Sequence, residues 1–567
     1  MKLTKSQKKQ LKRCIKEKGI EKISEEMKIP VRDIEKHLLE IWGKDKYNKF
    51  KSDREQKQLT KEEGHSDKYF ILFLIILILI CYGKFLGHEF VSDDITNIVT
   101  ASNINSIKYA LGGFGLNLRN LIIFLINKAA GLNPAYYRGT NILFHIGCTI
   151  LIYRIVTQLV SKETGKITAL IFAVHPILSE AVIWVSGGVY VYSSFFTLLS
   201  IFLYINREKN KKFYNLSIIS FIFSFLNLVQ AAALAPIFSI YEYSKSTLKK
   251  NFKPALVYNA ILLISVPWYF ILARQRAMSL QTDFYQERTG SNPLIQIPTA
   301  IGEYIKLIFW PRNLTLYHTE LSFTPLAYAI NLSIFTCLIL LTIFLYRKNR
   351  KMVFWPLLFL IALSPTLTPL GISWIVAERY VYLASVGIFV LVAWALELAT
   401  KKLFGQRCIK WLYIILAIMI LPLSLRTISR NKDWKSHDTL WLATAKFSPS
   451  SPQNHNNLGD YYIRHKQYDK AVEEFIKAIE LKPGYADAYH NLANTYTETG
   501  DVENAIKNYE EAIKYNPKLW QSYQNLGVMY YHLGDKEKAQ SYIEKSLEIN
   551  PNNGDLKKAL DYISTQP

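Results

Sequence analysis

Two adjacent aspartates, Asp93 and Asp94, follow the first long apolar stretch of the chain. A carboxyl group beside low-dielectric lipid holds its proton more tightly than one in water, which suits a base that takes a proton from a hydroxyl group. Paired carboxylates also suit the binding of a cation. The alternative is structural, because Ser92 is a good helix cap and acidic residues stabilise the first turn of a helix. The residue types leave both roles open.

His175 and Glu180 form a second group, inside an apolar stretch that Pro176 interrupts. Ionisable groups at membrane depth are costly, and they mark candidate binding or catalytic sites. The alternative is a helix broken at the proline, in which the histidine meets a carbonyl group that the break releases. Both interpretations place this group at the end of a membrane helix.

A third group, Glu378-Arg379-Tyr380 followed by Tyr382, opens another apolar stretch. An arginine can hold a phosphate through two parallel hydrogen bonds, which makes Arg379 a candidate for binding a phosphorylated ligand. The alternative is an interfacial ion pair within a belt of aromatic residues.

Apolar segments dominate residues 69–425 and must position these groups. A membrane helix needs about 20 apolar residues. Short loops rich in lysine and arginine mark the cytoplasmic side, and with the basic N-terminus they predict about 11 crossings. Loops 87–135 and 274–324 and the C-terminal tail then face outside. Arg119 and His318 lie in these outer loops and form a fourth group. Interfacial anchoring is the simpler role for each of them, but the predicted topology places all four groups on one face of the membrane.

The composition narrows the classes of function. The 567 residues carry a net charge of +23, and half of them are hydrophobic. Most of the positive charge lies in short loops between apolar segments, which argues against nucleic-acid binding. The five cysteines show neither a metal-binding nor a disulfide spacing, and any divalent metal stays unknown. The first apolar segment begins only at residue 69, so we expect an uncleaved anchor rather than a signal peptide.

Residues 452–551 repeat with a period of 34. Members of the repeat include Leu458, Leu492 and Leu526, Tyr462, Tyr496 and Tyr530, and Pro483, Pro517 and Pro551. This is the signature of three tetratricopeptide repeats (TPRs), helix pairs that stack into a solenoid. Binding of a peptide or protein is the favoured role, and stability or dimerisation is the alternative. We expect a connector with a degenerate half-repeat over 426–451 and a capping helix over 552–567.

The N-terminal residues 1–43 predict three short helices with the spacing of a helix-turn-helix, the last opened by Pro30. DNA contact is one interpretation of this lysine-rich segment. A small cytoplasmic module, or an element that docks a partner, is the favoured one. Residues 44–68 are charged and have no apolar period, which is typical of a linker.

Several strings in the middle region, together with the TPR tail, resemble the transmembrane and tetratricopeptide-repeat O-mannosyltransferases and their prokaryotic relatives. These enzymes belong to the GT-C superfamily of polytopic glycosyltransferases. In chain order the strings are SDD from Ser92, YYRGTNILFH ending at His145, FAVHPILSEAVIWVS from Phe172, GEYIKLIFWPRNLTL from Gly302, AERYVYLASVG from Ala377 and RNKDW from Arg430. The resemblance runs from about residue 85 to 551 and implies an all-α fold, a GT-C type transmembrane bundle with a C-terminal TPR solenoid.

The resemblance also implies a reaction. The donor would be a polyprenyl-phosphate sugar in the membrane, and the acceptor a hydroxyl group, such as Ser or Thr of a protein, on the extracytoplasmic face. The short solenoid and the lysine- and isoleucine-rich composition suggest that the membrane is a bacterial plasma membrane. Asp93 or Asp94 would take the acceptor proton. The residues implied in donor or acceptor binding are Arg119, His175, Glu180, His318, Glu378, Arg379, Tyr380 and Tyr382. Among these, the two arginines would neutralise the leaving phosphate.

Some charged positions of the family pattern are absent. After WVSG the family usually has an arginine and then an acidic residue, where this chain has Gly188-Val189-Tyr190. Val229-Gln230 stands where the family usually has Lys-Glu, and Arg119-Asn120 replaces an Arg-Pro pair. A second hypothesis is therefore a catalytically degenerate, membrane-anchored TPR scaffold for the assembly of envelope proteins. A transporter is a weaker third hypothesis, because no inverted repeat is present.

Overall fold

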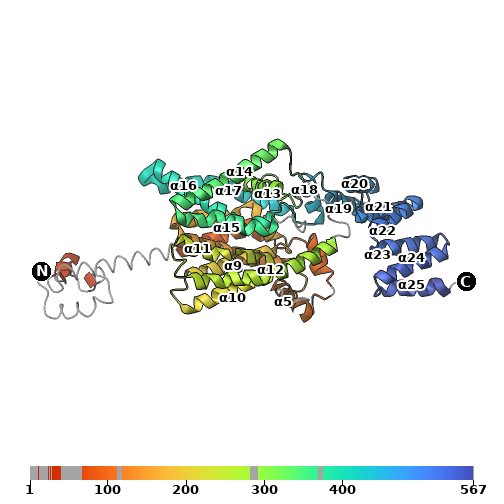
Figure 1. Ribbon diagram of the computed structural model, residues 1–567, viewed down its shortest axis with the longest axis horizontal. Coiled ribbons are helices and arrows are strands. Elements are labelled where there is room, and N and C mark those ends of the chain that lie inside the picture. The colour runs from red at the N-terminus through yellow and green to blue at the C-terminus, as the bar shows by residue number, and fades with distance from the viewer. Residues whose placement is uncertain are drawn as a thin grey trace. The chain divides into compact units, whose positions relative to one another are not determined.

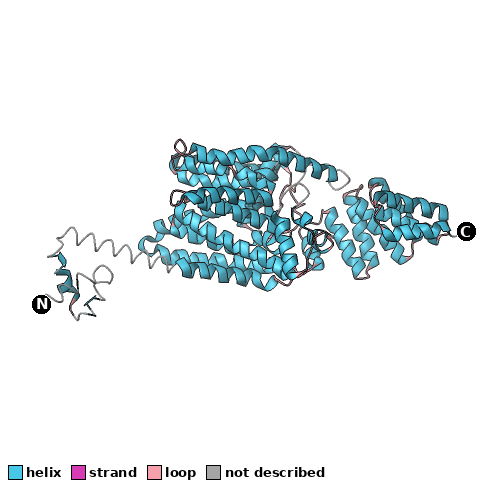
Figure 2. Ribbon diagram, turned by 90° about the horizontal axis from the view of Figure 1, so that it is seen from below, coloured by secondary structure: helices cyan, strands magenta, loops and turns pink. Residues whose placement is uncertain are grey.

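The computed structural model describes residues 67–101, 103–111, 118–280, 292–367 and 374–565, with scattered residues between 11 and 39. All regular structure in these residues is helical, and no strand occurs among them (Figure 2). The predicted all-α fold is thereby confirmed. The chain divides into two compact units, Met1–Phe73 and Leu74–Pro567.

Little of the N-terminal unit is described. A helical turn covers residues 31–36 directly after Pro30, whose carbonyl accepts hydrogen bonds from the N–H groups of Asp33 (2.9 Å) and Ile34 (3.3 Å). The rest of the predicted helix-turn-helix over 1–43, and the predicted linker 44–68 up to residue 66, lie outside the described residues.

Six of the described helices are long and apolar enough to cross a membrane (Figure 1). They are Asp67–Phe85, α6 (Pro134–Leu159), α9 (Gly188–Ile205), α14 (Pro325–Lys348), α16 (Val381–Phe404) with the preceding turn η7 (Glu378–Tyr380), and α17 (Cys408–Lys432). A seventh span results if α7 (Lys162–Val174) and the segment Pro176–Ile183, bent by 55° at the proline, cross as one. The chain is a multi-pass membrane protein, and the count of about 11 crossings stays a prediction.

The helix α16 is the most deeply buried of the six and packs against α7, α9, α15 (Phe354–Leu363) and α17. Gly387 makes the contact with α15 close, because a Cβ atom there would lie 2.3 Å from the carbonyl oxygen of Trp355. A helix this enclosed can hold the residues at its N-terminal end, Glu378 to Tyr380, in fixed positions.

The two predicted outer loops contain helices of their own. Within 87–135 lie η2 (Ile95–Val99), α4 (Ile107–Leu111) and α5 (Leu118–Ala130), and within 274–324 lies α13 (Pro293–Phe309). The helix α13 packs on α14 and buries one face, with Asn292 as its N-cap. It has 17 residues, among them Gln296, Glu303 and Lys306, and is not one of the six candidate spans.

The apolar region 213–244 contains two helices, α10 (Lys211–Asn227) and α11 (Pro236–Ser244). They are joined by the 3₁₀ segment η4 (Val229–Leu234), and Pro236 opens the second helix. The helix α10 packs along α9, while α11 contacts α12 (Phe252–Leu280) (Figure 1). The break places Gln230 in the 3₁₀ segment rather than on a membrane helix.

The C-terminal region contains the three predicted helix pairs, with one helix before them and one after them. The pairs are α19 (Pro452–Arg464) with α20 (Tyr468–Leu481), α21 (Ala486–Thr499) with α22 (Val502–Tyr515), and α23 (Trp520–His532) with α24 (Lys536–Ile549). The helix α25 (Gly554–Thr565) follows, and α18 (His437–Ala445) precedes them. Gly459 faces Phe475 so closely that a Cβ atom would lie 2.4 Å from the ring, which explains the small residue at this position.

Candidate active site

The turn that carries the two aspartates follows the first membrane helix and leads into η2. Ser92 has a φ of 55°, so the backbone takes a left-handed conformation just before Asp93. The hydroxyl group of Ser92 has no hydrogen bond among the described residues, so Ser92 does not act as the helix cap that its residue type suggested. Asp93 is exposed and Asp94 is fully buried. The two adjacent aspartates therefore have opposite environments, Asp93 at the surface and Asp94 in the interior.

Both carboxylate oxygens of Asp94 accept hydrogen bonds from the backbone. The N–H group of Ser186 donates to Oδ1 at 2.8 Å, and that of Val91 donates to Oδ2 at 3.3 Å. Burial raises the pKa of the Asp94 carboxyl to about 6, although these hydrogen bonds act in the opposite direction. Asp93 has no partner of this kind among the described residues, so its carboxylate is available to a ligand.

The segment Val182–Ser186 receives hydrogen bonds from two residues one turn apart on α6. Asn141 donates to the carbonyl groups of Val182 (3.2 Å) and Trp184 (3.1 Å), and Arg138 donates to that of Ile183 (3.0 Å). Because α6 is a long membrane helix, it holds this segment, and through Ser186 the aspartate turn, against the bundle.

Arg138 also binds the approach to the aspartate turn. Its guanidinium group donates to the carbonyl groups of Leu86, His88 and Glu89, and its side chain is fully buried. We did not single out this arginine from the sequence. The criterion applied to His175, an ionisable group in an apolar stretch, would have found it.

Arg379 forms a buried ion pair with Glu180. The backbone N–H of Arg379 donates to the second oxygen of the same carboxylate at 3.1 Å. The guanidinium group also lies over the rings of Trp184 (5.5 Å) and Tyr380 (4.9 Å). Trp184 in turn donates from its indole N–H to the carbonyl of Val91 at 3.3 Å. The arginine and the aspartate turn are therefore joined through one tryptophan.

Glu378 belongs to a second buried cluster. Its Oε1 lies 3.1 Å from the guanidinium of Arg430 and 3.7 Å from Nε2 of His318. Arg430 also pairs with Asp433 at 3.0 Å. The other oxygen of Glu378, Nε of Arg430 and Nε2 of His318 are buried without a hydrogen-bond partner. Unsatisfied polar atoms of this kind are costly and suit the binding of water or a polar ligand.

The remaining predicted residues have mainly structural contacts. Arg119 donates to the hydroxyl group of Ser186 at 3.3 Å, which brings it to the aspartate turn. His175 accepts a hydrogen bond from the N–H of Ile177 (3.3 Å) at Nδ1, so Nε2 is its donor to the carbonyl of Ile308 (2.9 Å). The helix is bent at Pro176, but the carbonyl that His175 meets belongs to Ile308 on α13 and is not one released by the break. The hydroxyl group of Tyr382 bonds to His145 at 2.7 Å. A binding role for these residues stays a prediction.

A cavity of about 50 Å³ adjoins Arg379 and is lined by Tyr190, Gln230 and Tyr380 among others. Tyr190 and Gln230 are two of the positions at which this chain departs from the resembled family. Gln230 also lines a neighbouring groove of about 230 Å³, between η4, α12 and the turn at Ser364. Two positions that lack the family's usual charges, Tyr190 and Gln230, therefore lie together beside Arg379, the arginine predicted to bind phosphate.

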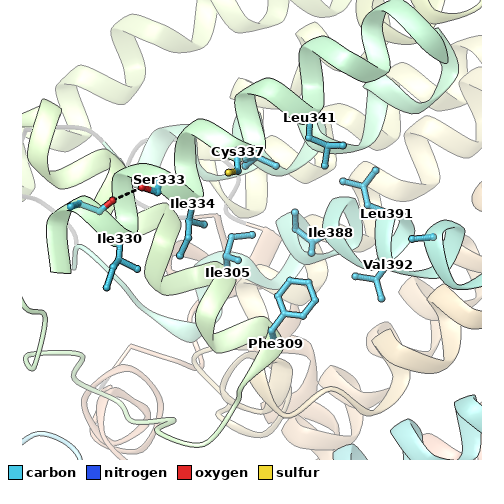
Figure 3. Close-up of a pocket in the computed structure, with 13 residues that line it drawn as sticks. Ile305, Phe309, Ile330, Ser333, Ile334, Cys337, Leu341, Ile388, Leu391 and Val392 are labelled. Atoms are coloured by element: carbon cyan, nitrogen blue, oxygen red, sulfur yellow. Dashed lines mark hydrogen bonds between the residues drawn. The ribbon is translucent and has the colours of Figure 1, made fainter. Parts of the chain in front are cut away.

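A cavity of about 700 Å³ lies between α13, α14 and α16 (Figure 3). Its labelled lining is apolar apart from Cys337 and Ser333, and the Ser333 hydroxyl donates to the carbonyl of Ala329 in its own helix (2.7 Å). A second cavity of about 450 Å³ shares Phe309 with it. The second cavity is also lined by His175, Arg312 and Arg426, whereas the mainly apolar lining of the first suits hydrocarbon.

The comparisons with known proteins agree with this architecture. The tetratricopeptide repeat model matches residues 450–518 and 484–552. Protein O-mannosyl-transferase TMTC3 of Homo sapiens is 26% identical over 402 residues, covering 62% of this chain and 43% of its own length. A protein O-mannosyl-transferase of Caenorhabditis elegans is 24% identical over 479 residues, covering 76% and 65%. Protein O-mannosyl-transferase Tmtc2 of Drosophila melanogaster is 31% identical over 118 residues, covering 20% and 12%. The chain spans less than two thirds of the length of each.

Proposed function

As a relative of the transmembrane and tetratricopeptide-repeat O-mannosyltransferases, this chain is, we propose, a membrane glycosyltransferase. It transfers a mannose-like sugar from a polyprenyl-phosphate donor to a hydroxyl group, Ser or Thr of a protein, on the extracytoplasmic face. The TPR solenoid binds the acceptor protein. The relatives' names, the repeat match and the apolar helices support the enzyme class. The donor and the face rest on the residues below.

Asp93 is the proposed general base. Its carboxylate is exposed and has no partner in the described part of the chain, whereas both oxygens of Asp94 are occupied by backbone N–H groups. In the proposed step Asp93 takes the proton of the acceptor hydroxyl as its oxygen attacks C1 of the sugar. The bond between C1 and the phosphate oxygen breaks, and the electron pair leaves with the lipid phosphate.

Arg379 is the proposed phosphate ligand. Its cation neutralises charge that develops on the leaving group, and Glu180 and the ring of Trp184 keep it in place. The groove that Gln230 shares with the Arg379 cavity would take the first isoprene units of the donor. The cavity of about 50 Å³ has to widen when a phosphate enters.

One observation carries this proposal. The segment Val182–Ser186 connects the proposed base with the proposed phosphate ligand. Ser186 donates a hydrogen bond to Asp94, the neighbour of Asp93, and the ring of Trp184 lies against the guanidinium group of Arg379. The base and the phosphate ligand are thus positioned from a single stretch of backbone. Such shared positioning fits a reaction in which proton transfer and departure of the phosphate occur together.

The test is a transfer assay with the purified chain, polyprenyl-phosphate mannose and a Ser/Thr peptide. We expect transfer by the wild type, a loss of at least about 100-fold in Asp93→Asn, and little change in the control Glu303→Gln, an i,i+3 partner of Lys306 on α13. Transfer by Asp93→Asn at the wild-type rate would rule out the proposed base.

The second candidate function is a membrane-anchored scaffold. The observation in its favour is that Arg379 is already paired with Glu180 in a small cavity without the usual family charges. A scaffold would transfer no sugar from any polyprenyl-phosphate donor, yet would still bind its partner proteins through the TPR solenoid.

A further inference from the structure

The cavity of about 450 Å³ is formed by α7, α13, α16 and α17, and it shares no lining residue with the cavity beside Arg379. Its wall is apolar over most of its length and includes Ile171, Val392 and Ile418. Trp310 and Ile418 are exposed, so the cavity is open at the outside of the bundle. In a membrane protein that side faces lipid.

The cavity has the depth of a lipid chain. Along α17 its wall runs from Arg426 to Ile418, eight residues or about 12 Å of helix. Half of the hydrocarbon core of a bilayer is about 15 Å thick. A lipid with its head group at Arg426 would therefore place its chain along this wall through most of one leaflet.

Two arginines lie at one end of the cavity, and neither is paired with a carboxylate in the described part of the chain. Arg426 donates from Nε to the carbonyl of Pro311 (3.1 Å) and from Nη2 to that of Arg312 (2.9 Å). These bonds leave Nη1 of Arg426 without a hydrogen-bond partner among the described residues. Arg312 is exposed, and its guanidinium group makes no hydrogen bond or ion pair with any described residue. No aspartate or glutamate lines the cavity.

The carboxylates closest to these arginines are already used. Asp433 and Glu378 are the acidic residues that act on Arg426, and both pair with Arg430, at 3.0 and 3.1 Å. The end of the cavity therefore carries positive charge that the protein itself does not compensate. Arginine matches the geometry of a phosphate group through paired hydrogen bonds, so a phosphate is the anion that this end suits best.

A second apolar space meets the first close to the arginines. Phe309 and Val392 line both this cavity and the cavity of about 700 Å³ between α13, α14 and α16, where Figure 3 shows them. Phe309 stands only three residues before Arg312. Two chains that leave one head group can enter the two spaces, whereas the single chain of a polyprenyl phosphate fills only one of them.

We propose that Arg312 and Arg426 bind the phosphate of an anionic diacyl phospholipid, whose two chains occupy the two cavities. The exposed Trp310 fits this position, because tryptophan is enriched at the level of the lipid head groups. Basic pockets between membrane helices are typical sites for anionic head groups. This site is separate from the donor site proposed at Arg379, and its occupation does not depend on catalysis.

The experiment titrates the full chain in detergent micelles with phosphatidylglycerol and with phosphatidylcholine of the same chains, and native mass spectrometry gives each Kd. We expect phosphatidylglycerol to bind at least about fivefold more tightly, because phosphatidylcholine has no net charge. Arg312→Gln should raise the Kd for phosphatidylglycerol at least about fivefold. Its side chain contacts no described residue through a polar group, so the variant should fold, which thermal unfolding checks. Lys128→Gln, which removes an exposed cation from α5, is the matched control and should bind like the wild type.

A second variant tests the two-chain arrangement. Ser333→Trp places a large side chain in the cavity of about 700 Å³ and should raise the Kd for phosphatidylglycerol at least about threefold. The same variant should bind single-chain lysophosphatidylglycerol like the wild type, because the cavity at Arg426 stays open. Thr336→Trp, on the exposed side of α14 and outside both cavities, is the control. Unchanged binding of phosphatidylglycerol by Ser333→Trp would overturn the two-chain arrangement.

Polyprenyl phosphate distinguishes this site from the donor site. Arg312→Gln should leave its Kd unchanged, because the donor phosphate is assigned to Arg379. An equal loss of polyprenyl phosphate and phosphatidylglycerol in Arg312→Gln would assign the cavity to the donor lipid and overturn the proposal. Equal binding of phosphatidylglycerol and phosphatidylcholine by the wild type would overturn it as well, because no head-group site would then exist.

Discussion

The buried carboxylate of Asp94 accepts a hydrogen bond of 2.8 Å from the backbone N–H of Ser186, a residue 92 positions later in the chain. This bond joins the turn after the first membrane helix to the segment that also carries Trp184. Asp94 therefore positions the turn, and its exposed neighbour Asp93 is left for chemistry.

The buried position of Asp94 predicts a pH dependence of stability. Its pKa is raised from 3.8 to about 6 by burial. Because the folded-state pKa exceeds the unfolded value, the stabilisation is fully present below about pH 4 and is lost as the pH rises through about 6. The change corresponds to about 3 kcal/mol. Thermal unfolding of the solubilised protein between pH 4 and 7 should show this fall in the wild type and not in Asp94→Asn.

The control for that measurement is Asp93→Asn, which changes the exposed neighbour and leaves the Asp94 carboxyl in place. If the unfolding curves of Asp94→Asn and the wild type run parallel over this pH range, then Asp94 is not the titrating group.

Arg138 should be required for the shape of the aspartate turn. Arg138→Lys keeps the charge but cannot reach the carbonyl groups of Leu86, His88, Glu89 and Ile183 together. The carbonyl of Ile183 is buried, and a buried carbonyl left unsatisfied costs about 1–3 kcal/mol. We expect faster hydrogen exchange over residues 86–94 and a lower transfer rate. Unchanged exchange there would contradict the positioning role.

The Glu180–Arg379 pair should behave as a buried pair and not as a surface one. Removing one partner, in Glu180→Gln, leaves a buried charge uncompensated and should cost about 3–5 kcal/mol of stability. The double variant Glu180→Gln/Arg379→Gln should recover part of that loss. The more exposed pair Lys306–Glu303 is the matched control, and Glu303→Gln should cost less than about 1 kcal/mol. If the stability losses of the two single variants, measured by thermal unfolding, add up to the loss of the double variant, then the two residues are not coupled.

The aspartate turn and the TPR solenoid should share one side of the membrane. Single cysteines at exposed positions, Thr96→Cys and Asp469→Cys, should react with a membrane-impermeant maleimide added from outside. Lys249→Cys, in a predicted cytoplasmic loop, should react only after permeabilisation. Labelling of residues 96 and 469 from opposite sides would remove the common compartment that the proposed reaction needs.

Sequence reasoning found the elements whose signals are local or periodic. The 34-residue period located the TPR helices, and the apolar composition of residues 69–425 located the region of the long membrane helices. It passed over α13, which contains Gln296, Glu303 and Lys306 and whose buried face becomes visible only once α14 packs on it. Arg138 stands in an apolar stretch and could have been selected by its charge, but its partners are backbone carbonyl groups, which residue types do not reveal.

By itself the sequence determined which residues were able to do chemistry, which segments are helical and apolar, and that the tail is a TPR array, because each of these depends on residues close together in the chain. Only the tertiary structure decided that Asp94 is enclosed while Asp93 is exposed, that Arg379 pairs with Glu180, and that Tyr190 and Gln230 meet beside that arginine. Burial and hydrogen bonding are set by partners far away along the chain, and those partners meet only when the helices pack.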